Sequence, residues 1–306
     1  MDTGGVLVGT AGWSFPDWEG IVYPKGAARS QEGLRFLSRL FDALEINVSF
    51  YRPILPSMAR SWLSCVSSSP AFRFTAKLWQ GFTHRRDGRH EAEETAWREG
   101  VEPLLEAGRL EAVLAQFPHS FRNVAASRAY LDALLDRFAS LPLVVELRHV
   151  SWMTDDVLAM LHERNVGCCN VDQPLLGDAA PPATLVTADV GYVRLHGRNR
   201  RDWFRADAGR DARYDYLYSE DEVDEWARRI GLMRGAAPRA RIFIIANNHY
   251  RGQAAANALE LKSALTGEPV AVPASMLAAF PRLERVAAKT TGADDVEPGG
   301  QAPLPL

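Results

Sequence analysis

Short apolar segments that are rich in β-forming residues alternate with longer amphipathic segments along almost the whole chain. This alternation predicts an α/β fold, because apolar β-rich runs are typical of buried strands and apolar side chains at helical spacing are typical of helices. Eight strands are predicted: Val6–Trp13, Ala43–Phe50, Phe72–Leu78, Ala112–Phe117, Leu143–His149, Val166–Asp172, Gly191–Gly197 and Ala240–Asn247. Helices are predicted between them, over residues 34–41, 58–65, 93–106, 131–138, 155–164, 221–233 and 253–265.

Strands that alternate with helices pair in parallel through right-handed crossovers. Eight such units usually close into a barrel of about 250 residues, and the chain has 306. The pattern therefore predicts a single closed (β/α)8 TIM-type barrel rather than an open sheet. No linker rich in Pro, Gly or Ser divides the chain into halves. We predict one barrel domain over residues 1–286 and a flexible tail over residues 287–306, which lack a periodic apolar pattern.

The composition is ordinary for a globular protein, with 47% hydrophobic and 24% charged residues. A net charge of −3 argues against a generally basic nucleic-acid binder. The sequence shows neither a signal-peptide pattern nor an apolar run of about 18 residues, which predicts a cytoplasmic protein that does not associate with membranes. The three cysteines agree with this prediction, and the neighbours Cys168 and Cys169 are predicted to be small apolar core residues.

Polar side chains gather at the carboxyl ends of seven of the eight predicted strands, which is where barrels of this kind build their active sites. Side chains two residues apart on a strand share a face, so Glu146 and Arg148 are predicted to lie together, as are Arg194 and His196. Burying even one unpaired ion costs several kcal/mol. The charged groups at this end must therefore be hydrated, paired with one another or in contact with a ligand.

The residue types suggest two sets of roles at this end of the barrel. Carboxylates and an imidazole suit general acid and base catalysis, and the predicted catalytic residues are Glu45, Glu146, Asp172 and His196. Cationic, amide and aromatic side chains suit an anionic or sugar-like substrate. The predicted substrate-binding residues are Trp13, Asn47, Tyr51, Lys77, Gln116, Arg148, Trp152, Arg194, Arg198, Asn247 and Asn248.

Structural roles are the alternative for many of these residues. Glu146 with Arg148, and Glu45 with Lys77, can form ion pairs inside the barrel. His196 can be a hydrogen-bonded core residue. The aromatic residues can belong to the core, and the paired asparagines can cap the last helix; these residues are Trp13, Tyr51, Trp152, Asn247 and Asn248.

A divalent metal is a further alternative, with Glu146, Asp172 and His196 as ligands and Asn248 as a fourth. The neighbouring Arg148 would repel a cation there. The chain contains no nucleotide-cofactor motif such as a P-loop or a Gly-x-Gly-x-x-Gly fingerprint.

Three functions are compatible with these residues. The favoured one is an enzyme of isomerase-like, epimerase-like or hydrolase-like type that acts on a small anionic or sugar-like, possibly phosphorylated, substrate at the mouth of the barrel. The second is a nucleic-acid-binding or nucleic-acid-processing protein that uses the loop over residues 198–213, which holds six Arg and one Trp. Asp202, Asp207 and Asp211 reduce the charge of that loop. The third is a ligand-binding barrel without catalysis.

The strand-end motifs, read together, resemble the YecE-like domain of unknown function 72 family over about residues 5–266. The motifs that carry the resemblance are Gly9–Ser14, Glu45–Asn47, Phe50–Tyr51, Gln116–Pro118, Glu146–His149, Arg194–Arg198, Arg213–Tyr218 and Asn247–His249. The resemblance implies a β/α barrel and no particular reaction. The chain departs from the family pattern at Ser49, where Thr is common, and at Ile244–Ala246, where an aromatic residue is common.

Overall fold

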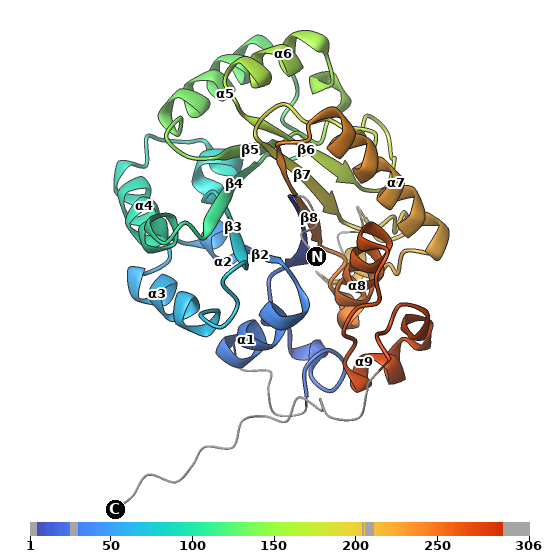
Figure 1. Cartoon of the computed structure of the whole chain (residues 1–306). Coiled ribbons are helices and arrows are strands. Elements are labelled where there is room, and N and C mark those ends of the chain that lie inside the picture. Colours follow the sequence, from blue (N-terminus) through green and yellow to red (C-terminus); the bar gives the residue numbers. More distant parts are fainter. Residues whose placement is uncertain (1–4, 25–29, 204, 206–210, 290–306) are drawn as a thin grey trace, which may run out of the picture.

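A closed barrel of eight parallel strands forms the centre of the computed structural model, which describes residues 5–24, 30–203, 205 and 211–289 (Figure 1). Each strand pairs with its neighbours in chain order, and β1 closes the barrel against β8. The strands are β1 Val6–Ala11, β2 Ala43–Ile46, β3 Arg73–Lys77, β4 Leu110–Gln116, β5 Leu143–Glu146, β6 Gly167–Asp172, β7 Val190–Leu195 and β8 Arg241–Ala246. The predicted (β/α)8 barrel is confirmed.

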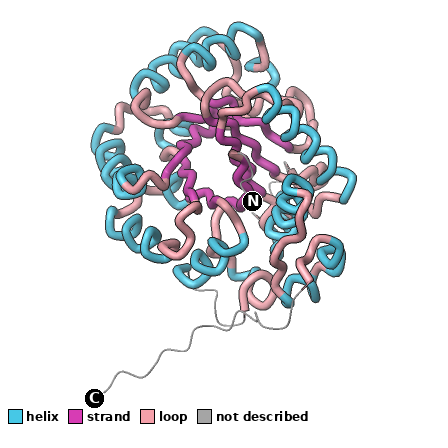
Figure 2. The backbone as a smooth tube through the Cα atoms, in the orientation of Figure 1, coloured by secondary structure: helices cyan, strands magenta, loops and turns pink. Residues whose placement is uncertain are grey.

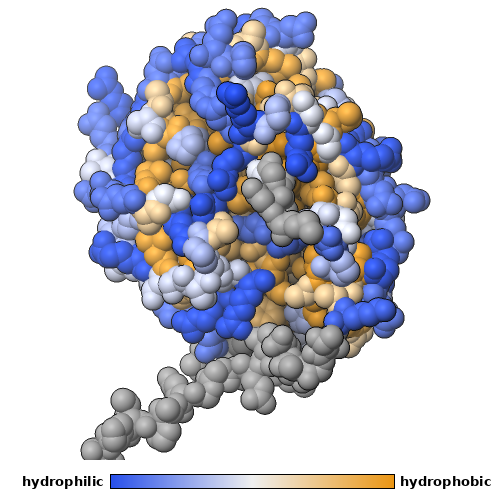
Figure 3. Space-filling model, viewed as in Figure 1, coloured by the Kyte–Doolittle hydropathy of each residue, from blue (hydrophilic) through white to orange (hydrophobic). Residues whose placement is uncertain are grey.

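An outer ring of helices surrounds the strands (Figure 2). Its members are α1 Ser30–Leu40, α3 Pro56–Cys65, α4 Glu91–Glu106, α5 Ala125–Arg137, α6 Asp155–Glu163, α7 Glu220–Ala236 and α8 Gln253–Thr266. Two short helices, α2 Val48–Tyr51 and α9 Ala274–Ala279, complete the set of α-helices in the described ranges. All seven predicted helices are present. Hydrophilic residues predominate around the edge of the molecule, where these helices lie (Figure 3).

Two apolar layers hold the fold together. One fills the barrel and includes Leu7, Leu114 and Phe243, and the other lies between the strands and the helices. Gly9 is required on β1 because a Cβ atom there would lie 1.7 Å from the carbonyl oxygen of Ala43 on β2. This close approach of two backbones leaves no room for a side chain.

The prediction for the second strand extended too far. The strand ends at Ile46, and the chain then turns into the short helix α2, so residues 47–50 are not β-structure. Because of this turn, Asn47 and Tyr51 both lie at the mouth of the barrel, although Tyr51 is 59% exposed.

The first residues of the predicted tail are part of the fold. Ala288 donates a backbone hydrogen bond to Val270, and Val270 donates one to Val286, so the chain is paired up to this point. Residues 290–306 of the predicted tail lie outside the described residues. Cys168 belongs to the outer apolar layer and Cys169 to the inner one, as predicted for sequence neighbours on a strand. None of the helices in the described part is long and apolar enough to cross a membrane.

Candidate functional site

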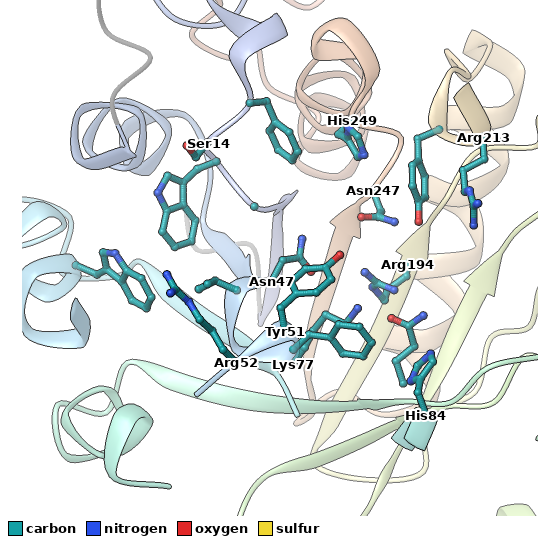
Figure 4. A pocket seen from close by; sticks show the side chains of 18 of the residues that line it. Ser14, Asn47, Tyr51, Arg52, Lys77, His84, Arg194, Arg213, Asn247 and His249 are labelled. Atoms are coloured by element: carbon teal, nitrogen blue, oxygen red, sulfur yellow. The ribbon is translucent and has the colours of Figure 1, made fainter. Parts of the chain in front are cut away.

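A pocket of about 760 Å³ opens at the carboxyl ends of the strands (Figure 4). Eight of the predicted site residues line it: Trp13, Asn47, Tyr51, Lys77, Gln116, Arg148, Arg194 and Asn247. They come from β1, β2, β3, β4, β5, β7 and β8 or from the residues just after them. The prediction that polar strand ends gather at one site is therefore confirmed for this set.

A layer of paired charges lies directly beneath the pocket. Arg194 bridges two carboxylates, with Nη2 at 2.7 Å from Glu45 Oε1 and Nη1 at 2.7 Å from Glu146 Oε2. Arg148 Nε donates to Glu146 at 2.5 Å, and the hydroxyl of Tyr192 donates to Glu45 at 3.0 Å. Burial would raise the pKa of Glu146, but the guanidinium groups of Arg148 and Arg194 hold it well below its usual value. Both carboxylates are fully buried and absent from the pocket lining.

His196 belongs to the same buried layer. Its Nε2 lies 3.3 Å from a guanidinium nitrogen of Arg148 and 3.3 Å from one of Arg194, and its Nδ1 lies 2.8 Å from the amide of Asn247. Burial and the two guanidinium groups lower the pKa of His196 to about 3. The imidazole is therefore neutral at pH 7 and does not line the pocket, so the structure does not place it to act on a ligand as the predicted acid or base.

Asp172 faces away from the pocket. The inner residues of β6 are Cys169 and Val171, so Asp172 points outward to α7, where Trp226 Nε1 donates to it at 2.5 Å. Arg198 Nε and Nη2 each donate to its carboxylate at 2.9 Å. The predicted catalytic role of Asp172 and the predicted substrate contact of Arg198 are corrected, because these two residues join β6 to the segment after β7 and neither lines the pocket.

Trp152 and Asn248 also lie elsewhere than predicted. Trp152 is fully buried, stacks on Phe121 at 5.1 Å between ring centroids and donates its indole N–H to the Phe121 carbonyl. Asn248 is fully buried and donates to the carbonyl oxygen of Tyr216 and to the side chain of Asn257. Both residues are structural.

The predicted metal-binding set does not assemble. Glu146 and His196 are 3.5 Å apart, but Asp172 is on the outer face of β6 and Asn248 is bonded elsewhere. Within the described residues, no three His, Cys, Asp or Glu side chains are placed to hold a metal ion. The alternation of strand side chains explains the error, because it predicts which residues share a face but not which face that is.

Lys77 has the most unusual surroundings of the pocket cations. Its side chain is buried, and its Nζ lies 4.0 Å from the centre of the Phe50 ring. This Nζ forms no hydrogen bond or ion pair with a described residue, since the nearby carboxylates are paired with arginines. Burial and the positive charge of Arg194 lower the pKa of Lys77 to about 7, although Glu45 acts in the opposite direction.

Several pocket residues were not predicted from the sequence. His84 bonds to Thr83 through Nδ1, and burial together with the charges of Lys77 and Arg148 lowers the pKa of His84 to about 4. The other lining residues that were not predicted are Gly12, Ser14, Phe15, Val48, Phe50, Arg52, Met58, Trp62, Arg213, Tyr214 and His249. A signal existed for those that belong to the family-like motifs, namely Gly12, Ser14, Phe50, Arg213, Tyr214 and His249. Trp62 gave no signal, because it lies on α3 in an ordinary amphipathic pattern.

Acid is expected to destabilise the protein between pH 6.5 and about 4. Because His84 and His196 have lowered pKa values when folded, the unfolded chain binds more protons in this range, and the stability present above pH 6.5 is lost as the pH falls. The free energy of unfolding should fall by up to about 1.4 kcal/mol per pH unit for each histidine. Urea unfolding at pH 7, 6 and 5 measures this slope. His84→Asn should reduce it and the exposed-site control His162→Asn should not; equal slopes for both variants would contradict the assignment.

The charges on the pocket lining are of one sign. Five cationic residues line it, and none of the described lining residues is Asp or Glu; the cations are Arg52, Lys77, Arg148, Arg194 and Arg213. Three buried polar atoms at the pocket have no hydrogen-bond partner: Trp13 Nε1, Gln116 Oε1 and Arg194 Nε. Such atoms cost free energy unless a ligand or water satisfies them.

Aromatic rings form the rim of the pocket. Trp13 packs edge-on against Trp62 with centroids 5.3 Å apart, and Phe15 stacks on His249 at 4.7 Å. Tyr214 packs against His249, with ring centroids 4.8 Å apart. Rings of this kind suit the flat face of a sugar or another planar group.

Fold and site together define a (β/α)8-barrel protein with a cationic, aromatic-rimmed pocket at the carboxyl ends of its strands. Residues 7–282 match the family described as "Protein of unknown function DUF72". The chain belongs to the DUF72 family, which confirms the resemblance seen in its strand-end motifs.

Relatives with known names or structures support this assignment. The chain is 30% identical to the UPF0759 protein YunF of Bacillus subtilis (strain 168) over 272 residues, which span 84% of this chain and 93% of that protein. A solved DUF72 family protein of Thermotoga maritima is 34% identical, with a TM-score of 0.74 over 85% of this chain and 99% of the other. A solved DUF72 family protein of Enterococcus faecalis is 26% identical, with a TM-score of 0.74 over 85% and 95%. These names specify no reaction.

Proposed function

We propose that this protein is an enzyme that binds a small anionic or sugar-like substrate, including phosphorylated ones, and acts on it by acid and base chemistry at the mouth of the barrel. The observation that supports this proposal best is the positive charge of the pocket lining, which has five cationic residues and no carboxylate among its described members. Guanidinium groups bind carboxylate and phosphate oxygens in a planar, two-point geometry.

The buried charge layer has a supporting role in this proposal. Glu45, Glu146 and His196 fix the planes of the two guanidinium groups from below, which preorganises their remaining donors. Lys77 and His84 line the pocket itself and are able to exchange protons with a ligand. Proton transfer of this kind serves an isomerase, an epimerase or a hydrolase. The three cysteines are free, and we propose a cytoplasmic location on that ground.

The nucleic-acid alternative receives less support from the described part of the loop after β7. Arg198 is bound to Asp172, Glu222 and Glu225, and Arg205 pairs with Asp202. These guanidinium groups are not free to follow a phosphate backbone. Residues 204 and 206–210 of this loop lie outside the described residues.

Removing a pocket arginine is expected to weaken anion binding. Arg52 and Arg213 line the pocket, and their guanidinium groups form no hydrogen bond or ion pair with a described residue, so each is available to a ligand. Arg52→Gln and Arg213→Gln should each raise the Kd for inorganic phosphate about 10-fold, the loss of one charge-assisted hydrogen bond. Calorimetry in phosphate-free buffer measures this change.

A matched control is Arg89→Gln, which removes an arginine that is 92% exposed and not on the lining. It should leave the affinity unchanged. Equal affinity in all three variants, or no phosphate binding by the unmodified protein, would overturn the anion-pocket proposal. Tight, salt-sensitive binding of a single-stranded oligonucleotide with no binding of phosphate would favour the nucleic-acid function instead.

A further inference from the structure

Lys77 is a buried amine to which the proposed function assigns only proton exchange with a ligand. It is the last residue of β3, and Figure 4 shows it at the centre of the pocket near Asn47, Tyr51 and Arg194. Only 8% of the residue is exposed, yet it lines a pocket of about 760 Å³. A ligand in this pocket therefore meets the amine directly.

The surroundings of Lys77 favour a neutral amine over an ammonium ion. An ammonium group has three N–H donors, and no described residue accepts a hydrogen bond from Lys77. The two carboxylates whose charge acts on Lys77, Glu45 and Glu146, already form ion pairs with Arg194 and Arg148. Burial and the guanidinium groups of Arg194 and Arg148 lower the pKa of Lys77 to about 7, against the opposing charges of Glu45 and Glu146. About half of the molecules carry the free amine at pH 7, against about one in 2,500 for an ordinary lysine.

We propose that Lys77 is a covalent catalytic residue that forms an imine with an anionic aldehyde or ketone. The inference rests on the proposed function and adds to it the substrate class, a carbonyl compound that also carries a carboxylate or phosphate. The cationic side chains around Lys77 explain why the substrate carries a carboxylate or phosphate. A neutral amine inside a pocket explains why it carries a carbonyl group, because amines attack carbonyl carbons and ammonium ions do not.

The chemistry balances without a co-reactant. The lone pair of Nζ forms a bond to the carbonyl carbon, and the electron pair of the C=O double bond moves to oxygen. Both N–H protons of the amine move to that oxygen. The oxygen then leaves as water while the C=N bond forms. His84 lines the same pocket and is neutral at pH 7, so it is able to accept and return a proton. The product is an imine and one molecule of water.

Reductive trapping tests this inference on the full chain. The protein is incubated at pH 7 with pyruvate, which has both a ketone and a carboxylate, and with sodium cyanoborohydride, which reduces an imine to a stable amine. The chain has only four lysines, Lys25, Lys77, Lys262 and Lys289, so peptide mass spectrometry locates the product. We expect the adduct on Lys77, at least about 10-fold above each other lysine, because the lowered pKa of Lys77 leaves much of its amine neutral at this pH. Equal labelling of the four lysines, or no labelling of Lys77, overturns the inference.

Two variants separate the covalent role from simple anion binding. Lys77→Met removes the amine and keeps an unbranched apolar side chain, and Lys77→Arg keeps the positive charge without an amine nucleophile. We expect both variants to abolish the adduct at position 77, while Lys77→Arg, which keeps a cation in the pocket, should still bind phosphate. The rate of labelling should also rise between pH 6 and 8 and then level off.

The outcomes distinguish the two proposals. Phosphate binding without an adduct on Lys77 overturns the imine and leaves the anion pocket intact. An adduct on Lys77 that excess phosphate fails to suppress supports the imine and contradicts the anion pocket. Labelling that rises steadily to pH 10 shows an ordinary lysine and overturns the inference.

Discussion

Replacing Arg194 with methionine is expected to lower the free energy of unfolding by about 3–5 kcal/mol, the usual cost of removing one partner from a buried ion pair. Arg194 is 1% exposed and holds Glu45 and Glu146 at 2.7 Å each. Glu146 keeps Arg148 in the variant, but Glu45 keeps only the hydroxyl of Tyr192. Urea unfolding at pH 7, followed by circular dichroism, measures the loss.

The double variant Arg194→Met with Glu45→Gln provides the control. Because it removes the carboxylate that the single variant leaves unpaired, it should recover part of the lost stability. Two results would contradict the interpretation: a loss below about 1 kcal/mol for Arg194→Met, or purely additive effects in the double variant. Arg194 therefore has two roles, since it supports the barrel interior and also lines the pocket.

Replacing Asp172 with alanine is expected to cost about 2–3 kcal/mol of stability while leaving phosphate affinity unchanged. Its carboxylate holds Arg198 and Trp226, and so joins β6 to α7. We place the cost below the usual range for a buried pair because Arg198 is 26% exposed at its side chain and keeps Glu222 and Glu225 as partners. Urea unfolding and calorimetry with phosphate measure the two quantities.

Asp172→Asn is the matched control, because it keeps the volume and one acceptor oxygen. It should lose less stability than Asp172→Ala. A fully stable Asp172→Ala variant with a large loss of phosphate affinity would show that Asp172 acts at the pocket, contrary to its position on the outer face of β6.

Much of the fold follows from local sequence pattern. All eight predicted strands and seven predicted helices are present. Apolar runs and helical spacing are local patterns, and each shows which residues of a single strand or helix are buried. The end of β2 was missed because Asn47–Phe50 alternates polar and apolar side chains as a strand does, and only the turn into α2 shows that the strand has ended.

The site was predictable only in part. Residues such as Lys77, Gln116 and Arg194 line the pocket as predicted, since strand ends of a parallel barrel meet at one rim. Glu45 and Glu146 were assigned to catalysis, yet they lie beneath the pocket, paired with arginines from other strands. Those pairs join residues far apart in the chain, and no local pattern reports which carboxylate meets which guanidinium.

By itself the sequence determined that this protein is an eight-stranded barrel with ionisable groups at the carboxyl ends of its strands. Only the tertiary structure decided which of those groups face a ligand. Barrel strands are buried on both faces, against the interior and against the helices, so neither face is marked by polarity. A spacing of two residues therefore placed Glu146 with Arg148 correctly, but the closure of the barrel turned Asp172 away from the pocket. It also left the amine of Lys77 inside without a hydrogen-bond or ion-pair partner among the described residues.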